Sequence, residues 1–276
     1  MDVSTEFVIE VSGPESNLDI CVNGFSVRKQ TPSTMQLRVG DIVFPDGIWN
    51  GAWVVSGREK YIKFKMSKFS HGLRLYADTG DGDVLLGYRV DPSITQHRLN
   101  EIVLSTQPMR VLYFVAPPKG GLKNITSIAT LSGRSDLWAI SLFGTLVTDV
   151  SALRNLSELR YLNLKWTLVS DISPLANLTE LRWLSLWGTR ADNLKALVGL
   201  QKLGMLNLRK TKVTDLAPIV SLERLIGLNL WGVPITDISP LAKLKNLKWL
   251  YLQETKVPTA EIAKLISQLP NCHVEG

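Results

Sequence analysis

The sequence predicts a chain in two parts, an all-β N-terminal domain of the sandwich or jelly-roll-like kind and a repeat solenoid closed by a C-terminal helix. Three observations lead to this fold class. Short apolar runs separated by turn residues fill the first part, leucine recurs every 22 residues in the second, and an amphipathic segment without the repeat ends the chain. We place the division at residues 1–115 and 116–276.

The first part carries eight short apolar runs, from Glu6–Val11 to Val84–Val90. Asn23-Gly24 separates two of these runs and is a strong signal for a two-residue hairpin turn. Tyr61–Lys65 alternates apolar and polar residues, as a half-exposed strand does. Several short strands with frequent glycine favour a β-sandwich or a jelly roll.

The second part repeats six times without insertion, and each unit holds three apolar positions. The first position is Leu137, Leu159, Leu181, Leu203, Leu225 and Leu247. The second is Ile140, Leu162, Leu184, Leu206, Leu228 and Leu250, and the third is Leu142, Leu164, Leu186, Leu208, Leu230 and Leu252. One unit cannot bury its own leucines, but stacked neighbours enclose a continuous core.

This pattern resembles the leucine-rich repeat in its 22-residue, internalin-like bacterial form, over roughly Ile125 to Val257. The resemblance implies a curved solenoid with parallel strands on its concave side and short turns or 3₁₀ segments on its convex side. Threonine stands in five units where the family most often has asparagine, at Thr145, Thr167, Thr189, Thr211 and Thr255.

Two further features of the repeat region have structural explanations. Asp149, Asp171, Asp215 and Asp237 each precede an apolar turn, where a carboxylate accepts backbone N–H groups, and we prefer this role to catalysis or metal binding. Thr259–Asn271 predicts an amphipathic helix that covers the last unit with Ile262, Leu265, Ile266 and Leu269.

The tryptophans of the repeat region do not occupy leucine positions. Successive strand residues point to opposite sides, so Trp183, Ser185 and Trp187 face outward if Leu184 and Leu186 face the core. Outward aromatic and basic side chains are typical of binding surfaces. The side chains predicted to contact a partner are Trp138, Phe143, Arg160, Tyr161, Lys165, Trp166, Arg182, Trp183, Trp187, Asn207, Arg209, Lys210, Asn229, Trp231, Trp249 and Tyr251.

This strip predicts a non-enzymatic module that binds a protein or peptide, such as a bacterial adaptor, an immunity protein or an effector. A carbohydrate-binding protein, using the strip or the N-terminal β domain, is the alternative function. Two alternatives concern the surface itself. The large side chains could cover the sheet by stacking on one another or by docking of the N-terminal domain, or the strip could be an oligomer interface.

Signals for catalysis and cofactors are weak. The three histidines, His71, His97 and His273, lie far apart and lack metal-ligand spacing, and Cys272 beside His273 is expected to be a buried cysteine. Phosphate-binding and dinucleotide-binding glycine motifs are missing from the sequence. We therefore expect no enzyme activity, no metal and no cofactor.

The composition restricts the partners and the location. The net charge of +6 is too mild for a dedicated nucleic-acid binder. No apolar stretch is long enough to cross a membrane and the N-terminus lacks a signal peptide, so we expect a cytoplasmic protein without nucleic-acid or membrane partners. Secretion as an effector without a cleavable signal remains an alternative.

Overall fold

The computed structural model describes nine strands within residues 5–90, and then residues 93–105, 109, 111–114 and 124–276. The nine strands are β1 (Thr5–Ser12), β2 (Asp19–Val22), β3 (Phe25–Gln30), β4 (Ser33–Leu37), β5 (Ile42–Pro45), β6 (Trp53–Val54), β7 (Tyr61–Phe69), β8 (Gly72–Asp78) and β9 (Asp83–Val90). Strands β9, β8, β7, β1 and β4 lie in that order in one sheet, and β3, β2, β5 and β6 form a second. Their grouping into a sandwich or jelly roll remains a prediction.

The first sheet continues into the repeats through β10 (Val111–Phe114). This strand pairs in parallel with β9 on one side and with the first repeat strand on the other. The division of the chain at residue 115 stays a prediction.

Helix α1 (Gln96–Ser105), which was not predicted from the sequence, lies beside the first repeat unit. The hydroxyl oxygen of Thr95 accepts the N–H of Arg98 at 3.2 Å and caps the first turn. Leu99, Ile102 and Val103 are buried on one helical face, so α1 covers the start of the repeat core.

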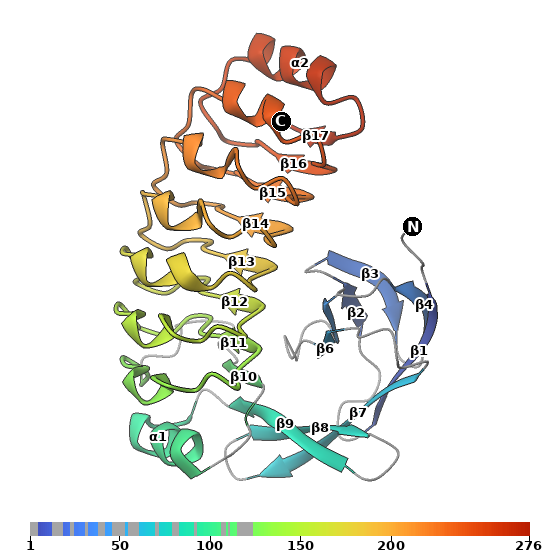
Figure 1. Cartoon of the computed structure of the whole chain (residues 1–276), viewed down its shortest axis with the longest axis vertical. Helices are drawn as coiled ribbons and strands as arrows, with labels where there is room; N and C mark the ends of the chain where they lie inside the picture. Colours follow the sequence, from blue (N-terminus) through green and yellow to red (C-terminus); the bar gives the residue numbers. More distant parts are fainter. Residues whose placement is uncertain are drawn as a thin grey trace.

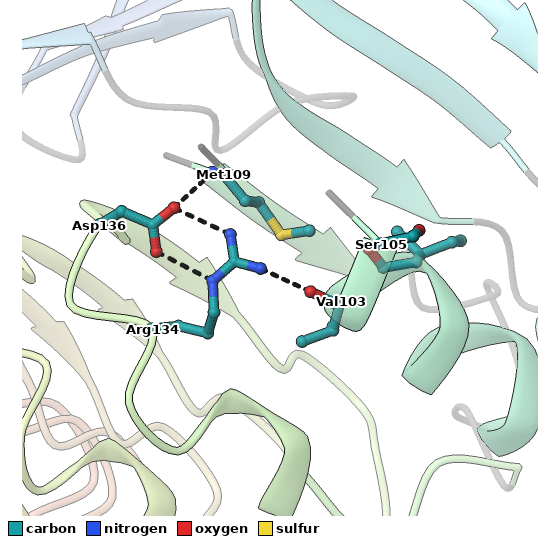
Figure 2. Close-up of polar contacts among 6 residues, drawn as sticks. Val103, Ser105, Met109, Arg134 and Asp136 are labelled. Atoms are coloured by element: carbon teal, nitrogen blue, oxygen red, sulfur yellow. Dashed lines mark hydrogen bonds and ion pairs between the residues drawn. The ribbon is translucent and has the colours of Figure 1, made fainter. Parts of the chain in front are cut away.

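Arg134 joins α1 to the first repeat unit, as Figure 2 shows. Its guanidinium donates to both carboxylate oxygens of Asp136, at 2.9 and 2.8 Å, and to the carbonyl of Val103. The same carboxylate accepts the N–H of Met109 at 2.6 Å. Burial by itself raises the pKa of Asp136, but the hydrogen bonds from Arg134 and Met109 outweigh it and the net shift is downward. The carboxylate therefore stays ionised at the point where helix α1, Met109 and the first repeat unit meet.

Six short strands form the repeat sheet, and 3₁₀ turns line the opposite side of the solenoid (Figure 1). The strands are β11 (Ala139–Ser141), β12 (Tyr161–Asn163), β13 (Trp183–Ser185), β14 (Met205–Asn207), β15 (Gly227–Asn229) and β16 (Trp249–Tyr251). The turns are η1 (Ala129–Leu131), η2 (Ser151–Leu153), η3 (Ser173–Asn177), η4 (Lys195–Leu197), η5 (Ala217–Ile219) and η6 (Ser239–Lys243). Every residue of the three apolar positions is at most 1% exposed, which confirms the predicted core.

Side-chain hydrogen bonds fix the turns between strand and 3₁₀ segment. The repeat threonines donate to the carbonyl three residues earlier at 2.6–2.8 Å, in Thr145, Thr167, Thr189, Thr211 and Thr255. The four repeat aspartates each accept the N–H two residues later at 2.7–2.8 Å, as predicted, and Asn193 does the same at 2.9 Å. Hydrogen bonds from Ser173 lower the pKa of Asp171, so this carboxylate stays ionised while it accepts them.

The C-terminal segment closes the solenoid with α2 (Thr259–Gln268) and β17 (His273–Glu275), which pairs in parallel with β16. Leu265 and Leu269 are buried and Ile262 is partly buried, so the predicted capping helix is present. The prediction for Ile266 is wrong, because this side chain is 45% exposed. It lies one residue beyond Leu265, about 100° further round the helix, outside the narrow stripe that touches the last unit.

Candidate functional site

The strand face of the solenoid consists of the outward side chains of β11–β16 and of the residues that follow each strand. The six strands pair in register, so residues 22 apart lie side by side: Tyr161 pairs with Trp183, and Trp183 with Met205. Leu184 between Trp183 and Ser185 is fully buried, whereas Trp183 is half-buried and points outward. This pattern agrees with the predicted outward direction of Trp183 and of the half-buried Trp187, whereas Ser185, also predicted to face outward, is 2% exposed.

Exposure of the strand face increases along the solenoid. All three residues of β11 and of β12 are buried, whereas each strand from β13 to β16 has at least one outward residue that is partly exposed. Within the strands themselves, accessibility thus begins at β13, but among the residues that follow the strands Lys165 is partly exposed and Trp166 is 50% exposed.

One row of the strand face alternates aromatic rings with cations, and we call it the aromatic–cation ladder. Its members, from neighbouring units, are Phe143, Lys165, Trp187, Arg209 and Trp231. The Nζ of Lys165 lies 4.8 Å from the ring centroid of Phe143 and 3.6 Å from that of Trp187. The guanidinium carbon of Arg209 lies 4.5 Å from the ring centroid of Trp187 and 3.8 Å from that of Trp231. Each cation is thus shared between two rings, at distances where cation–π attraction is effective.

The ladder carries positive charge without a counter-ion in the described part of the chain. No carboxylate there forms an ion pair with Lys165, Arg209 or Lys210. Burial lowers the pKa of Lys165, and the nearby charge of Arg209 lowers it further. The two cations therefore repel each other while the rings hold them in place.

The residue after each ladder position has a left-handed backbone. Glycine alternates there with large residues: φ is 72° at Gly144, 57° at Trp166, 69° at Gly188, 55° at Lys210 and 67° at Gly232. A Cβ at Gly188 would lie 2.9 Å from the Trp166 ring, so glycine leaves room for that ring. Trp166 lies with its ring centroid 6.2 Å from that of Trp187 and is 50% exposed, as an outward anchor would be.

A second set of stacked rings lies beside the ladder. Tyr161 and Trp183 stack with ring centroids 4.3 Å apart and an interplanar angle of 8°. The guanidinium carbon of Arg160 lies 5.5 Å from the ring centroid of Trp138. The expectation that Tyr161 is exposed is wrong, since it is 1% exposed with one ring face against Trp183. Stacking along the sheet, one of the alternatives left open, is therefore present, but the other predicted residues keep some exposure.

Asparagine side chains fix the backbone under the ladder. The Oδ1 atoms of Asn163, Asn207 and Asn229 each accept the N–H two residues later, at 3.0 Å. These acceptor oxygens are used internally, so the amide groups of Asn207 and Asn229 present mainly N–H donors to the outside.

A hollow of about 220 Å³ opens on the strand face next to the ladder. Gly227 forms part of it because this position carries a side chain in the neighbouring units, Met205 and Trp249. Trp183, Met205 and Tyr251 line it, together with Asn207 and Asn229. Sequence reasoning did not assign Met205 or Gly227 to the site, although a glycine in a row of large residues was a visible signal. Of the other predicted residues, Arg182 is half-buried, Lys210 is exposed, and Trp249 is 38% exposed.

The described residues offer little for catalysis or metal binding. They contain no cluster of three or more His, Cys, Asp or Glu side chains placed to hold a metal. The His273 ring lies 3.1 Å from a carboxylate oxygen of Glu275, and the Cys272 thiol contacts the His273 carbonyl, so no Cys–His dyad forms. Burial raises the pKa of Cys272, which is partly buried against the core and stays a thiol. A hollow of about 670 Å³ lies between η3 and η4, where Asp171 and Asn193 already serve as acceptors for the turns. Among the helices that the structure describes, none is long and apolar enough to cross a membrane.

Solved structures with the same fold include two bacterial internalins. Internalin C2 of Listeria monocytogenes matches 69% of this chain and 80% of its own, at 25% identity and a TM-score of 0.57. Internalin F of the same species matches 70% of this chain and 62% of its own, at 26% identity and a TM-score of 0.56. A plant peptide hormone receptor in complex with RGF2 shares the fold over 63% of this chain and 29% of its own, at 18% identity and a TM-score of 0.51.

No known protein-family model matches the sequence, and neither does a curated protein. The parallel strands and these structures together identify the repeat region as a leucine-rich-repeat solenoid of the internalin-like kind, as the 22-residue pattern predicts.

Proposed function

We propose that this chain is a non-enzymatic module that binds a protein or peptide partner through its strand face. The observation that carries the proposal is the aromatic–cation ladder, which presents ordered Trp, Lys and Arg side chains on a rigid parallel sheet. Trp and Arg are the residue types most enriched at binding hot spots. Side chains held by their neighbours lose less conformational entropy when a partner binds.

The predicted contact residues other than the buried Tyr161 keep their proposed role, with the centre of the interface on β13–β16 and on Lys165 and Trp166, which follow β12. The likeness to Listeria internalins supports a bacterial adaptor, immunity protein or effector. The plant receptor in complex with RGF2 illustrates peptide binding by the same fold. A cytoplasmic location and a separate β domain at residues 1–115 belong to the same proposal.

The ladder argues against carbohydrate binding at this strip. Sugars stack on an open aromatic face, but Trp187 has Lys165 on one side and Arg209 on the other. One face of Trp183 is likewise covered by Tyr161. The strip is therefore better suited to side chains and backbone groups of a protein, which approach the ring edges and the cations.

A photo-crosslinker placed in the strip tests the proposal. The crosslinking amino acid replaces Trp166, which is 50% exposed on the strand face, and in a control it replaces Ala176, which is exposed on the opposite side. Each protein is irradiated in lysate of the source organism, and crosslinked proteins are identified by mass spectrometry. We expect a defined protein to be captured from position 166 and not from 176. Equal capture from both positions, or capture from position 176 alone, would contradict the proposal.

A further inference from the structure

Hydrogen-bond donors lie on the accessible strand face. The carbonyl oxygens of Asn207 and Asn229 are already bonded to backbone N–H groups, so their amide groups offer mainly donors to the outside. The indole N–H groups of Trp187 and Trp231, the Nε–H of Arg209 and the Oε1 of Gln253 are buried and have no hydrogen-bond partner among the described residues, so they are out of reach of a ligand. The donors that a ligand can reach are therefore the amides of Asn207 and Asn229 and the partly exposed or exposed side chains of Lys165, Arg209 and Lys210.

The charge of the same surface has the matching sign. Lys165 and Arg209 lie two strands apart in the ladder, and Lys210 follows on the exposed side. No described carboxylate pairs with them, and the whole chain has a net charge of +6. Burial lowers the pKa of Lys165 and the charge of Arg209 lowers it further, and an anion between the two cations would oppose the second effect.

The hollow over Gly227 suits an apolar side chain of the partner. Its volume of about 220 Å³ is below the 300–1,000 Å³ typical of small-molecule sites, so it suits one side chain better than a whole ligand. Trp183 and Met205 supply apolar walls beside the donors of Asn207 and Asn229. The hollow and the ladder adjoin, so one peptide can reach both.

We propose that the partner presents an acidic segment in extended conformation, with carboxylates on Lys165 and Arg209 and an apolar side chain in the hollow over Gly227. This inference rests on the proposed protein-binding function and names the chemistry of the partner. The Nζ of Lys165 lies 3.6 Å and the guanidinium carbon of Arg209 lies 4.5 Å from the same Trp187 ring centroid, so the two cations are at most about 8 Å apart. An extended peptide rises about 3.3 Å per residue and points every second side chain to the same side, so carboxylates two residues apart, at about 6.6 Å, can reach both cations. Nucleic acid fits less well, because cations are few here and are held between rings.

Selection of peptides on the intact chain tests this inference. A display library of random octapeptides is selected against the wild type and sequenced. The affinities of the enriched peptides are then measured individually by fluorescence polarisation. A labelled single-stranded oligonucleotide is measured in parallel. We expect enrichment of acidic pairs spaced two residues apart and followed or preceded by an apolar residue. Replacing both carboxylates by amides is expected to weaken binding at least about tenfold, because hydrogen bonds to charged groups are among the strongest.

Two variants locate the peptide on the strand face. Arg209→Met removes the charge and keeps an apolar stem, and Arg209→Lys keeps the charge, so the first should lose acidic selectivity and the second should retain most of it. Gly227→Met fills the hollow with the side chain that its neighbour Met205 already carries. It should abolish the preference for an apolar residue in the peptide and leave the acidic selectivity unchanged. Gly199→Ala, where an added Cβ meets only an ordinary contact at 3.8 Å, is the control for glycine replacement.

Enrichment of non-acidic peptides, no enrichment at all, selectivity unchanged in Arg209→Met, or tighter binding of the oligonucleotide would each overturn the inference. The crosslinking experiment separates this failure from that of the proposed function. A protein captured from position 166 without acidic peptide selectivity leaves protein binding intact and removes only the acidic partner.

Discussion

Replacing Arg209 by methionine measures how much its cation–π contacts in the ladder contribute to the free energy of unfolding. The variant keeps a long apolar side chain but loses the cation that lies 4.5 Å from the ring centroid of Trp187 and 3.8 Å from that of Trp231. A cation–π contact contributes about 0.5–1 kcal/mol at exposed sites and about 2 kcal/mol when desolvated. Arg209 is half-buried, so its two contacts sum to about 1–3 kcal/mol, and relief of repulsion with Lys165 offsets part of this. We expect the free energy of unfolding to fall by about 1–2 kcal/mol.

Urea unfolding followed by circular dichroism measures this change. Arg224→Met is the matched control, because Arg224 is exposed and lies outside the ladder, and its effect should stay within about 0.5 kcal/mol. NMR titration of Lys165 gives an independent readout: its pKa should rise toward 10.5 in Arg209→Met, although burial still holds it below that value. The reasoning is refuted if Arg209→Met matches the control in stability and leaves the Lys165 titration unchanged.

Three further predictions concern the turns and the junction with α1. Asp136 should contribute stability above pH 3.8 that is lost in acid unfolding as the pH falls through its lowered folded pKa, because the carboxyl group binds its proton more readily in the unfolded chain. In Arg134→Ala this contribution should shrink. A pH profile of stability identical to that of the wild type would contradict the assignment. Thr189→Val should cost about 1 kcal/mol in urea unfolding, since it removes the hydrogen bond from the hydroxyl to the Leu186 carbonyl, and no loss would mean that shape alone fixes the turn. Trp166→Gly should leave stability within about 1 kcal/mol of wild type, because glycine tolerates the left-handed backbone, while partner capture falls; a larger loss would place the ring in the core.

The core of the solenoid could be predicted from the sequence because the same three apolar positions recur in every unit. Every unit must present apolar side chains at the same three positions, and Leu184 and its equivalents are all buried. The outward rows follow from strand alternation, which needs no tertiary information. What the leucine spacing cannot specify is how side chains on the surface pair, because that depends on rotamers. The burial of Tyr161 under Trp183 and the stacking of Lys165 on two rings are of this kind.

The elements at the two ends were harder to predict because they do not repeat. Helix α1 has apolar residues at Leu99, Ile102 and Val103 with Thr95 as cap, a helical spacing that strand-like neighbours obscured. Strand β17 is three residues long and forms because β16 offers an open edge. The hollow over Gly227 also depends on neighbours, since an absent side chain becomes a cavity only where adjacent units supply walls.

The left-handed row has a consequence for how the chain tolerates changes in length. Glycine units and bulky units alternate there, and aromatic and cationic residues alternate in the ladder beside it, up to Trp231 and Gly232. The surface therefore has a period of two units although the core has a period of one. Deleting a single unit would preserve the buried leucines but bring two units of the same type together, bulk against bulk or glycine against glycine. Only the insertion or deletion of two units at a time keeps the alternation of the surface. The exposed side chains, and not the core, therefore restrict which numbers of repeats are tolerated.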